Sequence, residues 1–126
     1  FSSMATDFTN TSNTVSITVA AANTICGKTN ATNSAINTWA ISTADPDGNT
    51  IQNGQSLTVT LIIDGSTAST YGDGCTVDGV SISTGVRWSG GSPPIATNNT
   101  DILTFLVVKD SAGVIRVYGQ GNTDFS

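Results

Sequence analysis

The most constraining feature of this chain is a mostly apolar run of eight residues, Asp101 to Val108, which follows a cluster of chain-breaking residues. Eight residues match the length of a buried strand better than that of a buried helix. The breakers, Ser89 to Pro94, contain Gly-Gly followed by Pro-Pro, which fits neither a helix interior nor a central strand. The chain must therefore turn before Asp101, and we expect Trp88 to close one end of the core with its ring buried and its N–H near the wet edge.

Composition extends this preference for strands to the whole chain. Thr, Ser and Asn supply 47 of the 126 residues, and Glu and His are absent. These residue types and Gly form helices poorly, whereas Thr suits strands and Asn suits turns. Alternating patterns such as Thr14 to Val19 and Ser56 to Asp64 are typical of half-buried strands.

We therefore expect an all-β fold: an antiparallel, jelly-roll-like β-sandwich of about eight short strands, with no helix longer than two turns. The length predicts a single domain over residues 1–126. Because Phe1 is not a translation start, we expect processing or a longer parent chain. The residues expected to form most of the core are Trp39, Leu57, Val59, Leu61, Trp88, Ile102, Leu103 and Phe105.

Charge and hydropathy exclude two classes of partner. The net charge is −5, and the four cations are scattered along the chain at Lys28, Arg87, Lys109 and Arg116. Nucleic-acid binding needs clustered cations, so we expect no nucleic-acid partner. No run approaches the roughly 18 apolar residues of a membrane-spanning helix, so we expect no membrane insertion.

Residues that carry chemistry are scarce. The chain offers no evident acid–base pair and no Gly-x-Ser-x-Gly motif, so we expect no enzyme activity, catalytic residue, cofactor or metal site. The segment Asp45 to Asn49 is interpreted as a turn, because its Gly is misplaced for a calcium loop. Tyr71 and Asp73 form the candidate receptor-contact loop, since an exposed aromatic ring beside Asp suits carbohydrate; a structural loop is the alternative.

The two cysteines, Cys26 and Cys75, leave two alternatives open. They are 49 positions apart, and a disulfide between them would add on the order of 4 kcal/mol by restricting the unfolded chain. The alternative is a pair of small buried hydrophobic side chains in a protein assembled in a reducing cytoplasm.

The last third of the chain resembles the closing portion of repeated β-domains in bacteriophage tail fibres and related virion appendage proteins. The matching phrases, in order, are Trp88, Gly90-Gly91-Ser92-Pro93-Pro94, Asp101-Ile102-Leu103-Thr104-Phe105, Val114 to Tyr118, and Thr123-Asp124-Phe125-Ser126. The resemblance implies a structural protein on the virion exterior, a tail-fibre or surface-appendage module that contributes to host attachment. Its implied partners are other virion proteins, further copies of itself in a trimer, and a host-surface glycan.

Two features of the sequence bear on assembly. The phrase Thr6-Asp7-Phe8-Thr9 resembles the phrase that begins at Thr123, which indicates one unit of a tandem array. The run from Asp101 to Val108 is apolar on both faces, so a neighbouring copy is expected to cover part of it; a central strand covered within one chain is the alternative.

The sequence is compatible with two other functions and disfavours a third. A capsid decoration or head-fibre protein could use the same module, and a bacterial adhesin or pilin-like subunit is also a Ser/Thr-rich β-sandwich. An adhesin predicts a disulfide, whereas a phage module predicts none. A glycan-processing enzyme is disfavoured because no credible pair of acidic residues is present.

Overall fold

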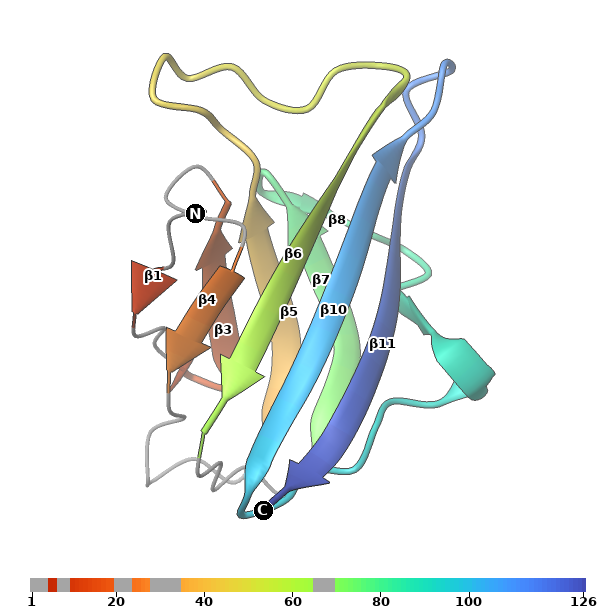
Figure 1. The fold of residues 1–126 in the computed structure, drawn as a ribbon. Coiled ribbons are helices and arrows are strands. Elements are labelled where there is room, and N and C mark those ends of the chain that lie inside the picture. The colour runs from red at the N-terminus through yellow and green to blue at the C-terminus, as the bar shows by residue number, and fades with distance from the viewer. Residues whose placement is uncertain (1–4, 7–9, 20–23, 28–34, 65–69) are drawn as a thin grey trace.

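Alternating apolar and hydroxyl-bearing residues produce two β-sheets packed face to face in the computed structural model, which describes residues 5–6, 10–19, 24–27, 35–64 and 70–126 (Figure 1). The front sheet contains, in spatial order, β1 (Ala5–Thr6), β4 (Thr24–Gly27), β6 (Gln55–Ile63), β10 (Thr100–Lys109), β11 (Ile115–Phe125) and β9 (Val86–Trp88). The back sheet contains β2 (Asn10–Thr11), β3 (Thr14–Thr18), β5 (Ile36–Ser42), β7 (Tyr71–Val77) and β8 (Val80–Ser81). Helical structure in these ranges is limited to one 3₁₀ turn, η1 (Ser89–Gly91). The expected all-β sandwich is confirmed.

The chain coils around the core by passing from one sheet to the other. Strands β3, β5 and β7 lie parallel in the back sheet, and β4 and β6 lie parallel in the front sheet. The last two strands, β10 and β11, form an antiparallel hairpin that sits between β6 and β9 (Figure 1). Five of the nine described strand pairings are parallel, so the sheets are mixed and not the antiparallel sheets expected. Alternation predicts that a strand has one buried face, but it carries no information about which strand lies beside it.

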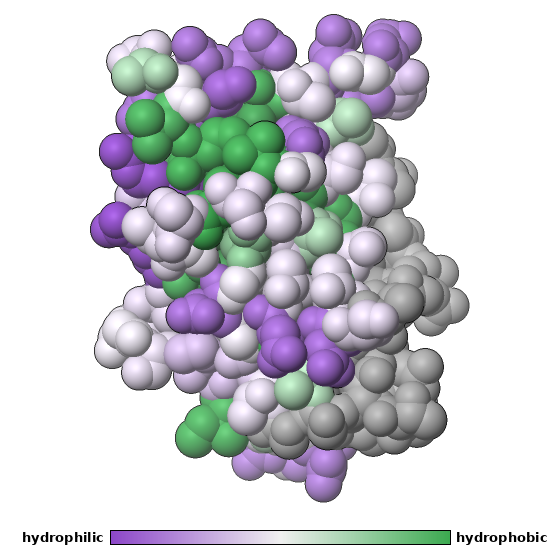
Figure 2. Space-filling model, turned by 180° about the vertical axis from the view of Figure 1, so that it is seen from behind, coloured by the Kyte–Doolittle hydropathy of each residue, from purple (hydrophilic) through white to green (hydrophobic). Residues whose placement is uncertain are grey.

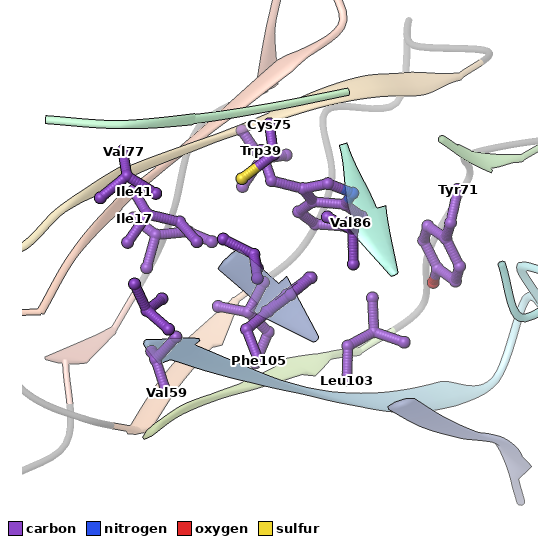
Figure 3. Packing of buried hydrophobic residues seen from close by; sticks show 14 of the residues in the cluster. Ile17, Trp39, Ile41, Val59, Tyr71, Cys75, Val77, Val86, Leu103 and Phe105 are labelled. Carbon is purple, nitrogen blue, oxygen red and sulfur yellow. The ribbon is translucent and has the colours of Figure 1, made fainter. Parts of the chain in front are cut away.

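The core lies between the two sheets, with Trp39 of β5 at its centre. The ring of Trp39 lies 5.1 Å from that of Phe105, 5.9 Å from that of Tyr71 and 6.4 Å from that of Trp88, measured between centroids. Its Nε1 donates a hydrogen bond to the carbonyl oxygen of Gly72 at 2.9 Å. Figure 3 shows Trp39 and Tyr71 reaching into the core from the back sheet and Phe105 from the front sheet. Such tilted and edge-to-face aromatic contacts stabilise a core beyond the area that they bury.

Six of the eight residues expected in the core are buried in the structure: Trp39, Val59, Leu61, Trp88, Leu103 and Phe105. Leu57 is half-buried and packs against the edge of the core. Ile102 is the exception, because it lies half-buried on the outer face of the front sheet. Since Leu103 points inward and side chains alternate along a strand, Ile102 must point outward.

Trp88 lies directly before η1, where the chain was expected to turn. Its ring is buried as expected, but its indole Nε1 is not at the wet edge of the core. Its ring is buried against Trp39 and Phe105. Its Nε1 is also buried, and no residue in the described part of the chain accepts a hydrogen bond from it. The indole N–H is therefore inside the sandwich and not at its wet edge.

Candidate interaction surface

Asp101 is the centre of a buried polar cluster that joins three segments of the chain. Its carboxylate accepts hydrogen bonds from the Tyr71 hydroxyl at 2.6 Å, from the Thr97 N–H at 2.9 Å and from the Asp124 N–H at 3.0 Å. The hydroxyl of Thr97 donates a fourth. An ionised carboxylate has about four acceptor positions, and these four donors fill them. The Asp101 carboxylate therefore holds the segments around Tyr71, Thr97 and Asp124 together and is not open to a ligand.

The hydrogen bonds determine the charge state of Asp101. Burial is the largest single influence and raises the pKa of its carboxyl group. The bonds from Thr97, Tyr71 and Asp124 together outweigh burial, and the pKa lies below its ordinary value. Asp101 is therefore an ionised carboxylate near neutral pH, although it is fully buried.

The prediction that Tyr71 and Asp73 form an exposed receptor-contact loop is wrong. Tyr71 is 3% exposed and belongs to β7, where its hydroxyl binds Asp101. Asp73 is exposed, but it lies within the same strand and not in a loop. A buried Tyr needs a hydrogen-bond partner, and its partner is 30 positions away in sequence. The pair Tyr71 and Asp73 therefore does not form an exposed sugar-contacting surface.

Cys75 is a free thiol buried in β7 of the back sheet. The disulfide with Cys26 considered from the sequence is not formed. Cys26 lies on β4 of the front sheet, where its backbone pairs with that of Ile62. Burial raises the pKa of the Cys75 thiol to about 12, so the thiol remains protonated.

A labelling experiment checks the state of Cys75. In a Cys26→Ser variant, we expect iodoacetamide to modify Cys75 rapidly in denaturant and only at the rate of unfolding in native buffer, because the reactive thiolate is absent from the fold. Mass spectrometry of the quenched reaction measures both rates. Equal rates in the two conditions would contradict the burial of this thiol.

The surface most suited to binding lies on the outer face of the front sheet, where β9, β10 and β11 run side by side. Strand register places Leu106 beside Tyr118 and Tyr118 beside Arg87, so these three form one row across the strands. Thr104 and Gln120 form the adjacent pair. Around them is a groove of about 330 Å³, here called the Arg87 groove, lined by Arg87, Trp88, Ser89, Thr104, Leu106, Tyr118, Gly119 and Gln120.

A second groove of about 330 Å³ adjoins the first, because Arg87 lines both. Its apolar lining comes from Val80, Ile82, Val114 and Ile115, with Arg116 beside them. Figure 2 shows apolar side chains gathered at one upper corner of the back of the molecule, the end at which β8 lies in Figure 1. Four of the six large exposed hydrophobic side chains of the described chain line these two grooves: Val80, Leu106, Val114 and Tyr118.

Arg87 is distinctive among the three cations whose side chains the structure describes. Arg116 forms an ion pair with Asp110 at 2.7 Å, and Lys109 donates to the carbonyl oxygen of Ile51 at 3.4 Å. Arg87 is exposed and makes no hydrogen bond or ion pair with any described residue. An unpaired guanidinium beside apolar and aromatic side chains has the composition that protein interfaces favour.

Sequence reasoning anticipated only part of this surface. The run of apolar residues indicated that β10 has an uncovered face, and Leu106 lies on it, 38% exposed. Tyr118 and Arg87 carried no comparable signal, because they join Leu106 only through the register of three strands.

The described part of the chain contains neither a cluster of metal ligands nor a membrane-spanning helix. In these ranges, no three acidic or cysteine side chains come together as metal ligands would. None of the described helices has the length and hydropathy to cross a bilayer. No known protein family, characterised protein or solved structure proved similar enough to this chain to match it.

Proposed function

We propose that this chain is a non-catalytic structural module of a bacteriophage virion, part of a tail fibre or another surface appendage, that acts by binding other proteins through the Arg87 groove. The observation that carries this proposal is the row Leu106, Tyr118 and Arg87, which leaves the outer face of a central strand apolar and uncovered. A sandwich that acts alone usually keeps such a face polar.

The resemblance to tail-fibre domains supports the virion assignment. The phrases that carry it correspond to consecutive parts of the structure. Trp88 ends β9, the segment from Gly90 to Pro94 begins in η1, and the last phrases lie in β10 and β11 except for Val114 and Ser126. In this proposal the module lies on the exterior of the particle, beside other virion proteins, and contributes to attachment to a host-surface glycan.

Three copies are the favoured assembly. The outer face of β10 also carries Ile102 and Val108, both half-buried, so a neighbouring copy would remove further apolar area from water. Charged residues make up only 10% of the chain, and the surface is rich in hydroxyl groups, so few charged side chains keep the copies apart.

A bacterial adhesin is the alternative from another class, and Cys75 bears on it. An exported adhesin is expected to contain a disulfide, because it folds in an oxidising compartment. A free, buried Cys75 favours a protein assembled in a reducing cytoplasm, as virion proteins are. A capsid decoration protein would satisfy the same observations as a tail-fibre module.

Immunogold electron microscopy tests the proposal. Antibodies raised against the recombinant 126-residue chain are expected to label particles of the phage whose genome encodes it, at the fibres or other appendages. Label confined to the capsid would favour the decoration protein. Label on uninfected bacterial cells, with none on particles, would contradict the virion proposal and favour the adhesin.

A further inference from the structure

We propose that the Arg87 groove of one copy binds the segment Thr123 to Phe125 of a second copy, with Asp124 paired to Arg87 and the Phe125 ring against Leu106 and Tyr118. This inference rests on the proposed association between copies and identifies the two surfaces that meet. Two large exposed hydrophobic side chains line neither groove. Of the six large exposed hydrophobic residues, these are Ile95 and Phe125.

Phe125 is presented to solvent in a way that suits a docking residue. It lies at the end of β11, is 50% exposed, and follows Asp124, which is also exposed. The backbone N–H of Asp124 donates to Asp101, and Asn99 Nδ2 donates to Asp124 Oδ1 at 2.6 Å. The other carboxylate oxygen, Oδ2, accepts no hydrogen bond from the described residues. An ordered acidic group with one free oxygen therefore precedes an exposed aromatic ring.

The Arg87 groove offers the complementary chemistry. Its guanidinium has no partner among the described residues, and a guanidinium binds carboxylates through a planar fork of donors. Leu106 and Tyr118 lie in the same row and supply an apolar and aromatic wall for a ring. The volume of about 330 Å³ is at the lower end of the range for ligand pockets, which suits one or two side chains of a peptide segment.

The contact must form between copies and not within one. Phe125 and Tyr118 are seven positions apart on the same strand, and a strand rises about 3.4 Å per residue, so roughly 24 Å separates them. The groove and the Phe125 end therefore lie on different parts of the molecule. Each copy donates one surface and accepts with the other, which is a heterologous contact that closes into a ring or extends into a fibre.

The repeated phrase in the sequence supplies a second Asp-Phe pair of the kind proposed to bind the Arg87 groove. Thr6-Asp7-Phe8 has the same residue types as Thr123-Asp124-Phe125, although Asp7 and Phe8 lie outside the described residues. An acidic residue followed by Phe is the ligand that the Arg87 groove fits, and the chain contains this pair twice.

Complementation between two variants tests the inference. Phe125→Ala retains the groove and removes the docking ring, whereas Arg87→Ala retains the ring and removes the cation of the groove. In sedimentation velocity of the 126-residue chain, each variant alone is expected to self-associate at least about tenfold more weakly than the wild type. An equimolar mixture is expected to form heterodimers that grow no further, because each pair contains one intact contact.

Ile95 and Asp124 supply the matched control substitutions. Ile95→Ala removes an even more exposed side chain outside both grooves and is expected to leave association unchanged. Asp124→Asn keeps the size and left-handed backbone of this residue and removes its charge, so it is expected to weaken association as Arg87→Ala does. A wild-type oligomer that Phe125→Ala leaves intact, or a mixture that stays monomeric, would overturn the inference and leave the virion assignment standing. A wild type that stays monomeric at every concentration would overturn the proposed association as well.

Discussion

Replacing Asp101 with alanine is expected to lower the free energy of unfolding by about 3 kcal/mol or more, one of the two largest effects predicted for this protein. The substitution removes the acceptor of four hydrogen bonds, which come from the backbone N–H groups of Thr97 and Asp124 and from the hydroxyl groups of Thr97 and Tyr71. An unsatisfied buried donor costs about 1–3 kcal/mol, and more than one donor is affected. Urea or guanidinium denaturation measures the change.

The control for Asp101 is an acidic residue that makes no side-chain hydrogen bond to the described chain. Asp47 lies in an exposed turn. Asp47→Ala is therefore expected to change the free energy of unfolding by no more than about 0.5 kcal/mol. If the two substitutions had similar effects, the Asp101 cluster would not join the segments as described.

The same group predicts how stability depends on pH. The pKa of Asp101 is lower in the fold than in the unfolded chain, so the unfolded chain takes up the proton first as pH falls. The contribution of Asp101 is therefore fully present above the unfolded pKa of about 3.9 and is lost as pH falls through the folded pKa below it. Asp101→Asn is expected to be less stable near neutral pH and to lose less stability than the wild type on acidification. Thermal unfolding at a series of pH values measures this, and parallel curves for the two proteins would contradict it.

Gly85→Ala is expected to cost about 2–5 kcal/mol, because two separate penalties add at this buried position. Gly85 has φ +62°, a conformation that residues with a side chain adopt only at a cost of about 1–2 kcal/mol. An added Cβ would also overlap the carbonyl oxygen of Asp73, and that backbone atom belongs to β7 and cannot move freely. Such crowding costs about 1–3 kcal/mol.

Gly79→Ala separates the two penalties. Gly79 has φ +82°, and nothing lies within 4 Å of the position where its Cβ would be. Only the backbone penalty applies there, so we expect a loss of about 1 kcal/mol. Denaturation of both variants compares them directly. A loss at Gly85 no larger than the loss at Gly79 would show that the approach of residues 73 and 85 is not tight.

The strands and turns could be predicted from the sequence because the preferences behind them are local. Thr, Ser and Asn disfavour helix wherever they occur, so the all-β class followed from composition alone. The segment Gly90-Gly91-Ser92-Pro93-Pro94 could only be a turn, and it separates β9 from β10 as expected. The length and hydropathy of the next run predicted a buried strand, and Leu103 and Phe105 of β10 are fully buried.

Pairing and register depend on residues that are far apart in sequence, and local patterns do not encode them. The parallel neighbours β3, β5 and β7 are separated by strands of the other sheet, so nothing within each strand indicates its partner. Ile102 was expected in the core because both faces of its strand are apolar, and only the packing of β10 against the back sheet decides which face is inside.

The candidate interaction surface was also predictable only in part from the sequence. The sequence alone determined that β10 has two apolar faces and that few charged groups surround it. Only the tertiary structure decided that Tyr71 is buried on Asp101, that Cys75 is a free thiol, and that the row from Leu106 through Tyr118 ends at Arg87. The physical reason is that a side chain's burial and its neighbours are set by strand register and by sheet packing. Both are fixed by the lowest free energy of the whole chain and not by any one segment.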